Sequence, residues 1–221
     1  MIIGIGNVAL DIARLLVLPN DQLAKTDIAD DALQTLAASG IEEVRLLARR
    51  GPAQAAFTPK ELEQLMAIAG LQLLVDPADL ELDDATARQL EQPEYAEARQ
   101  NLSLLRDIAS RPQAAGKRIR FMFYTSPTAF SADNGQVSSV HAQRTELVRD
   151  GQGQWVARPS EQTLDMPATL VVHAIGYQGS AIDELPFDSG RGVIQHEQGR
   201  ITGHANSRDY VAGWIKRGAS G

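Results

Sequence analysis

Residues 1–16 of the chain are MIIGIGNVALDIARLL, in which three apolar residues run directly into a glycine-rich turn at residues 4–9. In a dinucleotide-binding turn the first glycine permits a tight bend, the second lets the backbone approach a pyrophosphate, and a small third residue lets the following helix pack on the strand. Gly4, Gly6 and Ala9 meet these three requirements. A glycine turn also occurs for purely geometric reasons, but a strand before it and a helix after it favour nucleotide binding.

The helix after this turn is predicted to begin at Asn7 and to stop at Pro19. Its free N–H groups and positive dipole end would face the phosphates, which then need no basic side chain there. Four apolar residues recur at helical spacing, and we expect them on the buried face of this helix: Val8, Ile12, Leu15 and Leu16.

Residues 20–28 are expected to form a polar link, and residues 29–38 a second helix closed by Gly40. Residues 43–48 then form a short strand that ends at Arg49 and Arg50. Strand, helices and strand in that order predict a right-handed crossover between two parallel strands. The second strand would therefore end beside the glycine turn.

Arg49 and Arg50 occupy the place where NAD sites carry an acidic residue that accepts from the ribose 2′-hydroxyl. Two guanidinium groups suit the 2′-phosphate of NADP instead, because charge-assisted hydrogen bonds of this kind contribute about 1.5 to 3 kcal/mol each. The pattern therefore predicts NADP rather than NAD. Two solvated surface arginines are the alternative interpretation.

A third helix is expected from Thr58 onward, with Pro59 at its first position and Glu61 as the reciprocal glutamate of a capping box. Glu61 could equally orient a guanidinium group or accept from a ribose hydroxyl. Asp11, one turn into the first helix, is either a surface carboxylate favoured by the helix dipole or a proton-handling group near a nicotinamide. The core side of the third helix is expected to carry Leu62, Leu65, Met66 and Ala69.

The rest of the chain predicts further strands and two exposed helices. Residues 71–75 form a third strand, and residues 79–111 suggest two exposed helices without chemistry. A small antiparallel meander is expected within residues 118–158, with strands at 120–125, 137–148 and 154–158, followed by a strand buried on both faces at 169–175 and short strands near 193–194 and 210–212. The fold class is therefore α/β: a Rossmann-like NAD(P)-binding domain with a parallel central sheet, flanking helices and an antiparallel β-meander.

Composition excludes several classes of function. The 21 basic and 28 acidic residues give a net charge of −7, which argues against a nucleic-acid binder. No cysteine is present, so disulfides, thiolate nucleophiles and cysteine-ligated metal clusters are excluded. The four histidines have no metal-ligand spacing, and no metal site is expected. Without a long apolar run or a signal-peptide pattern, a cytoplasmic protein with no membrane contact is expected.

Five blocks of the sequence together resemble one family: GIGNVALDIARLL (4–16), LLARRGPAQAAFTPKELEQL (46–65), HAIGYQG (173–179), PFDSGRGVI (186–194) and YVAGWIKRGASG (210–221). The chain resembles the NADP-binding lobe of adrenodoxin-reductase-type ferredoxin-NADP reductases, flavoproteins with two dinucleotide-binding domains. The resemblance implies hydride transfer from NADPH to FAD and then single-electron transfer to a ferredoxin- or flavodoxin-like carrier. FAD is expected in the complete protein and not in this chain.

The resemblance also implies roles for individual residues. Ile5, Gly6, Asn7 and Val8 would meet the pyrophosphate, Arg49 and Arg50 the 2′-phosphate, and Glu61 the adenosine ribose region. Trp214 would approach the flavin, and Gly221 the nicotinamide end. Asp11 matches an acidic residue in a proton path. The segment GASG at 218–221 lacks the proline of the family's turn, so a less stiff turn is expected here.

The same resemblance predicts a partial protein. Residues 1–212 would be the NADP-binding domain with a shortened first strand, and residues 213–221 the start of a return to an FAD domain. The shortened strand predicts either marginal stability or oligomerisation through an exposed edge. The chain alone is expected to bind NADP(H) without turnover. Alternatives are an electron-supplying subunit of a related flavoprotein, a non-catalytic NADP-binding module, and a domain that has lost its function.

Overall fold

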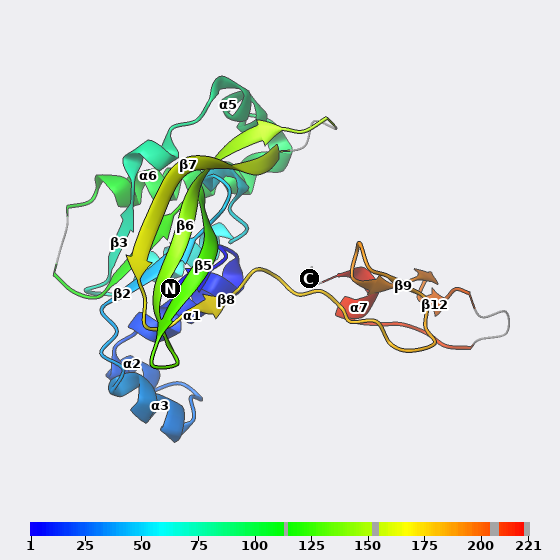
Figure 1. Ribbon diagram of the computed structural model, residues 1–221, viewed down its shortest axis with the longest axis horizontal. Coiled ribbons are helices and arrows are strands. Elements are labelled where there is room, and N and C mark those ends of the chain that lie inside the picture. Colours follow the sequence, from blue (N-terminus) through cyan, green and yellow to red (C-terminus); the bar gives the residue numbers. More distant parts are fainter. Residues whose placement is uncertain (113–114, 152–154, 204–207, 219–221) are drawn as a thin grey trace. The chain divides into compact units, whose positions relative to one another are not determined.

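The computed structural model describes residues 1–112, 115–151, 155–203 and 208–218. Contacts divide the chain into two compact units, Met1–Ile175 and Gly176–Gly221. The elements of the first unit are, in chain order, β1 (Ile2–Ile3), α1 (Asn7–Val17), α2 (Asn20–Leu23), α3 (Asp30–Ala37), β2 (Glu43–Leu47), η1 (Pro52–Gln54), α4 (Pro59–Met66), β3 (Gln72–Val75), η2 (Pro77–Leu80), α5 (Asp84–Leu90), η3 (Pro93–Tyr95), α6 (Ala96–Ser110), β4 (Arg118–Met122), β5 (Thr125–Asp133), β6 (Gln136–Arg149), β7 (Trp155–Pro167) and β8 (Val172–His173) (Figure 1).

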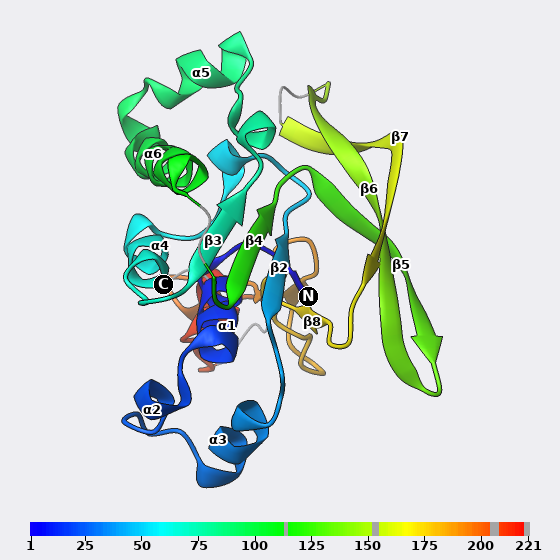
Figure 2. The same ribbon diagram turned by 90° about the vertical axis from the view of Figure 1, so that its left-hand side faces the viewer.

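The centre of the first unit is a five-stranded parallel sheet in the order β3-β4-β2-β1-β8 (Figure 2). The chain moves from β1 to β2 on one side and returns to β8 on the other side of β1. The carboxyl end of β1 is therefore a topological switch point, where open α/β sheets bind their ligands. The predicted parallel pairing of the first two strands is confirmed.

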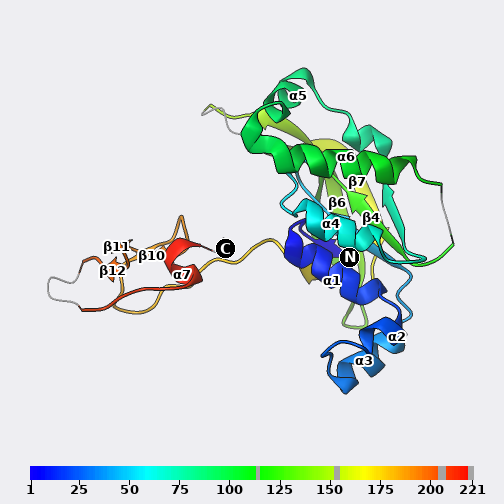
Figure 3. The same ribbon diagram turned by 180° about the vertical axis from the view of Figure 1, so that it is seen from behind.

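The parallel sheet lies between a helical layer and a second, antiparallel sheet (Figures 2 and 3). Helices α1, α4 and α6 cover one face, and their apolar residues form the main core with the sheet. The other face is covered by the antiparallel sheet β5-β6-β7. There Leu47 and Met122 of the parallel sheet pack against Val140, Ala142 and Met166. This layering leaves the carboxyl ends of β1 and β2 to be lined by loops.

The predicted buried face of α1 is partly wrong. Its buried residues are Ala9, Leu10, Ala13 and Val17. Val8 and Leu15 are 46% and 41% exposed, while Ile12 and Leu16 are partly buried beside the core. The small Ala9 and Ala13 let the helix lie close to the sheet, which rotates the larger Val8 and Leu15 outward.

Other local predictions need smaller corrections. The expected polar link contains the short helix α2, because Leu23 is buried and anchors it. Helix α4 ends at Met66, so Ala69 lies beyond it and is exposed. The predicted exposed helices at 79–111 are also wrong in part: α6 packs against the core through Leu102, Leu105 and Ile108.

The predicted meander began one strand too early. Strand β4 pairs in parallel with both β2 and β3, so it belongs to the central sheet. Tyr124, with φ of 50°, then turns the chain into β5, where the antiparallel sheet begins. That sheet extends from Thr125 to Pro167 rather than over residues 118–158. Its unpredicted first strand, β5, contains Pro127, which an edge strand accommodates.

The strand expected at 169–175 is shorter and more exposed than predicted. Only Val172 and His173 form β8, which lies at an end of the parallel sheet. Leu170 and Ile175 are 44% and 72% exposed. By contrast β1, although two residues long, has β2 on one side and β8 on the other. Among the described residues its shortness exposes no sheet edge, so oligomerisation through that edge has no basis in this fold.

The second unit consists of two short hairpins and one helical turn: β9 (Phe187–Asp188), β10 (Val193–Ile194), β11 (His196–Glu197), β12 (Arg200–Ile201) and α7 (Trp214–Arg217). The predicted strand at 193–194 is confirmed, and Tyr210 makes an isolated antiparallel bridge to Arg200. Ile194, Ile201 and Val211 form its small core. The predicted functional division at 212/213 differs from this compact boundary at 175/176 and stays a prediction.

Candidate functional site

The two glycines of the first turn have different structural roles. Gly4 has φ of 124°, and a Cβ there would lie 2.1 Å from the carbonyl oxygen of Ala174 in the neighbouring strand segment. Gly4 is therefore required by the fold itself. Gly6 has φ of −101°, and a Cβ there would meet no atom within 4 Å. The fold therefore does not require glycine at position 6. A ligand that approaches the backbone there would require it, because a side chain would block the approach.

Two helix amino termini meet at this turn. The side-chain oxygen of Asn7 accepts a hydrogen bond from the backbone N–H of Thr58, the N-cap of α4, at 2.8 Å. No side-chain cap hydrogen bond is made at the start of α1 or of α4. Both helices therefore direct positive dipole ends toward the same region, which favours an anion. The uncapped N–H groups come from α1, because Pro59 at the start of α4 has no N–H, and those of Glu61 and Leu62 donate to Thr58 O.

The arginine turn, formed by Arg49 and Arg50 after β2, lies beside the glycine turn at residues 4–9 because of the strand register. Ile3 pairs with Leu47, and the backbone N–H of Gly4 donates to Leu47 O at 2.9 Å. After one further residue, Ala48, come Arg49 and Arg50, which are exposed and whose side chains have no ion pair within the described part of the chain. Two free guanidinium groups thus lie at the carboxyl end of the strand adjacent to the uncapped helix terminus.

The loop between the arginine turn and α4 returns to the glycine turn. Ala56 N–H donates to Ile5 O at 3.2 Å, and Gly6 makes an isolated parallel bridge with Ala56. Val8 is half exposed at the first turn of α1, whereas Ala9 is fully buried and serves the packing of the helix. The two turns and the start of α4 are therefore one continuous backbone surface.

The predicted capping box of Glu61 is wrong. In such a box the glutamate accepts from the N-cap backbone N–H, but the N–H of Thr58 is already bound by Asn7. Glu61 instead lies 4.0 Å from the guanidinium of Arg14, which also bonds Asp11 at 2.5 Å. Arg14 further donates to Gln64, so it ties α1 to α4 behind the two helix termini. Asp11 and Glu61 thus both interact with Arg14. Among the described residues neither carboxylate forms an ion pair with Arg49 or Arg50.

The predicted roles of the remaining two residues, Trp214 and Gly221, stay predictions. Trp214 lies in the second unit, is 61% exposed and contacts the ring of Tyr177 at a centroid distance of 5.7 Å. Gly221 lies outside the described residues. Across the described ranges no group of three potential ligands could hold a metal ion, and no helix is long and apolar enough to cross a membrane.

The residues that surround the arginine turn are not signalled by any sequence pattern. Tyr124 lies over Gly51, where a Cβ would come within 2.3 Å of the tyrosine oxygen. Burial is the main cause that raises the pKa of the Tyr124 phenol above its usual value. The negative charges of Asp79 and Asp83 raise this pKa further. No spacing in the sequence signals these contacts, because they join segments that are distant along the chain.

Because the pKa of the Tyr124 phenol is raised above the usual tyrosine value, we expect this residue to add a late component to an absorbance titration at alkaline pH. A raised folded-state pKa means that the stability contributed by this phenol is complete below pH about 10 and is lost as the pH rises through the folded value. Tyr124→Phe should remove the late component. An unchanged titration curve in that variant would assign the raised pKa to another residue.

Comparisons with known proteins find relatives that match the whole of this chain. No protein-family model matches the chain. NADPH-ferredoxin reductase FprA of Mycobacterium tuberculosis is 43% identical over 223 residues, covering 100% of this chain and 47% of the relative. The solved structure of FprA in complex with NADPH superposes with a TM-score of 0.90 at 42% identity, over 100% of this chain and 47% of that one. The chain is homologous to ferredoxin-NADP reductases of this type.

More distant relatives extend the reductase homology to eukaryotes. The mitochondrial NADPH:adrenodoxin oxidoreductases of Arabidopsis thaliana and Bos taurus are 35% and 36% identical across the whole of this chain. The chain spans about half the length of these reductases, 48% and 46% respectively. The resemblance inferred from the sequence blocks is therefore confirmed, as is the mixed α/β fold.

Proposed function

We propose that this chain is the NADP(H)-binding portion of a flavoprotein oxidoreductase, with a Rossmann-like dinucleotide site at the carboxyl ends of β1 and β2. The observation that carries the proposal is the register that joins Gly4 to Leu47. It sets two arginines, which have no ion pair among the described residues, beside an uncapped helix terminus. The pyrophosphate would bind the turn at Gly6 and Asn7. The guanidinium groups of Arg49 and Arg50 would bind the 2′-phosphate.

The residues present fit NADP(H) on two counts. The empty space next to Gly6 Cα admits a phosphate, and the uncapped N–H groups of α1 stabilise its charge without a basic side chain. FAD, bound by the complete protein, would supply the hydride-accepting chemistry. What this chain's residues do is hold the nucleotide by its phosphates, so that the nicotinamide end is directed to the flavin.

Electrons would pass from NADPH through FAD to a ferredoxin- or flavodoxin-like carrier in the complete protein. The names of the homologues support this part of the proposal, since they are NADPH-ferredoxin and NADPH:adrenodoxin reductases. A cytoplasmic location belongs to the same proposal. Turnover is not expected of this chain alone, because the proposal assigns the flavin to the rest of the protein.

The test is calorimetric titration of the purified chain with NADP+ and, separately, NAD+. We expect NADP+ to bind at least about tenfold more tightly, the difference that one charge-assisted hydrogen bond supplies. Equal affinities would refute the assignment of the arginines, and no binding of either would refute the nucleotide site. NADPH oxidation by a carrier with this chain alone would refute the expected lack of turnover.

A further inference from the structure

The backbone of the arginine turn is held by the corner where β4 passes into the antiparallel sheet. Three consecutive carbonyl oxygens accept hydrogen bonds there: Ala48 O from Thr125 N–H at 2.9 Å, Arg49 O from the Thr145 hydroxyl at 2.7 Å, and Arg50 O from Tyr124 N–H at 3.2 Å. Thr145 N–H also donates to Tyr124 O at 2.8 Å, which joins the donors to one another. The turn is therefore fixed by a neighbouring sheet and not by its own sequence.

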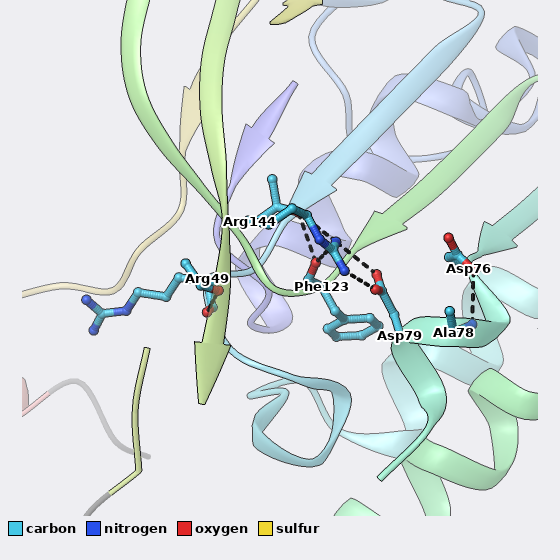
Figure 4. Close-up of polar contacts among 8 residues, drawn as sticks. Arg49, Asp76, Ala78, Asp79, Phe123 and Arg144 are labelled. Carbon is cyan, nitrogen blue, oxygen red and sulfur yellow. Dashed lines mark hydrogen bonds and ion pairs between the residues drawn. The ribbon is translucent and has the colours of Figure 1, made fainter. Parts of the chain in front are cut away.

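The corner is itself anchored by Arg144 (Figure 4). Its guanidinium donates to Phe123 O at 2.7 Å and forms an ion pair with Asp79. Asp79 is 4% exposed and lies in η2, the turn after β3. The N-cap of η2 is Asp76, whose carboxylate accepts from Ala78 N–H at 3.0 Å. A buried carboxylate with a hydrogen-bonded guanidinium is rigid, because separating the pair leaves an uncompensated buried charge.

The side chain of Arg49 extends away from this anchor while its carbonyl faces it (Figure 4). Thr145 is 6% exposed, so its hydroxyl bond to the Arg49 carbonyl is shielded from water. Loss of this bond would free the peptide between Arg49 and Arg50 to rotate. Both guanidinium groups would then lose their fixed starting direction, whereas the glycine turn would be unaffected.

We propose that Thr145, supported by the Arg144–Asp79 pair, is a positioning residue that sets the preference of this site for NADP over NAD. It touches no part of the nucleotide and acts through the backbone of the arginine turn. This inference rests on the proposed function. Preorganised hydrogen-bond donors bind more tightly than mobile ones, because binding no longer has to order them. The order of the arginine turn would affect the affinity for NADP and not that for NAD, since NAD has no 2′-phosphate for the arginines to bind.

The experiment compares Thr145→Val, which keeps the shape but removes the hydroxyl, with Thr145→Ser, which keeps the hydroxyl. Titration with NADP+ and NAD+ gives the ratio of the two Kd values for each variant. We expect Thr145→Val to weaken NADP+ binding about fivefold, the effect of one lost hydrogen bond, and NAD+ binding by less than about twofold. Thr145→Ser should retain most of the NADP preference of the wild-type chain.

Failure of the proposed function and failure of the inference are distinguishable. If the wild-type chain binds no NADP+, the proposed function fails and the inference fails with it. If the wild-type chain binds and Thr145→Val has the same Kd ratio, only the inference is overturned, whether the variant is less stable or not. If Thr145→Val fails to fold, Arg144→Lys is the second variant. It keeps the charge opposite Asp79 but loses the guanidinium N–H that also bonds Phe123 O. An unchanged Kd ratio in Arg144→Lys would likewise overturn the inference.

Discussion

Gly4→Ala is expected to cost the first unit about 3 to 5 kcal/mol of unfolding free energy, a large share of the stability of an ordinary domain. Two effects add. The backbone φ of 124° is strained for any side chain, and the new Cβ would lie 2.1 Å from Ala174 O. The clash is with backbone of the β8 segment, which cannot move without breaking its pairing with β1. Urea unfolding followed by circular dichroism measures the loss.

Gly6→Ala is the matched control for this prediction. Its Cβ would enter open space at a φ that alanine adopts, so we expect a stability loss of at most about 1 kcal/mol, the order of a changed helix N-cap. NADP+ binding should nevertheless fall sharply, because the methyl group occupies the approach of the pyrophosphate. If Gly6→Ala binds NADP+ as the wild type does, the phosphate is not at this turn. If Gly4→Ala is as stable as the wild type, the close approach to Ala174 is wrong.

The double variant Arg49→Ala/Arg50→Ala should lose most of its NADP+ affinity and almost none of its NAD+ affinity. Two charge-assisted hydrogen bonds at an exposed site, discounted for solvent screening, correspond to roughly 30- to 100-fold in Kd. Folding should be unaffected, because the hydrogen bonds of this turn come from its carbonyl oxygens and alanine keeps them. Calorimetry with both nucleotides measures the change.

Arg111→Ala is the charge control for the arginine variant. Arg111 is exposed after the end of α6 and pairs only with Asp107 among the described residues, so its removal changes the net charge at a distance from the site. NADP+ affinity should change by less than about twofold, as expected for a screened surface charge. An equal loss in this control and in the arginine-turn variant would mean that the turn contributes only general electrostatic attraction.

The first half of the fold could be predicted from local signals. Three of its features depend only on neighbouring residues: the glycine turn, the strand at 43–48 and the proline at the start of α4. The elements that they predict are present in the structure. The face of α1 could not be predicted, because Ala9 and Ala13 pack closely for reasons that lie in the sheet beneath them. Strand β4 was assigned to the wrong sheet because strand order is decided by contacts between distant segments.

The parts of the site that depend on a backbone motif could be predicted from the sequence. The parts that depend on side-chain contacts between separate elements could not. Gly6 and the two arginines stand out by type and position. No sequence signal indicated that the side chain of Asn7 binds Thr58, the N-cap residue of α4, which lies 51 residues away. The Asp79–Arg144 pair spans 65 residues and joins the predicted chemistry-free segment at 79–111 to the antiparallel sheet. Such pairs have no local period or spacing by which to find them.

The central claim is that the glycine turn and the arginine turn bind one molecule of NADP+. The most direct measurement is an amide and guanidinium NMR titration of the chain with NADP+. The account predicts that the backbone amides of Gly6 and Asn7 and the Nε–H signals of Arg49 and Arg50 shift together and saturate with a single Kd. With NAD+ the glycine-turn amides should shift while the arginine signals stay in place. Arginine signals that do not respond to NADP+, or that saturate with a Kd different from that of the glycine turn, would contradict the account.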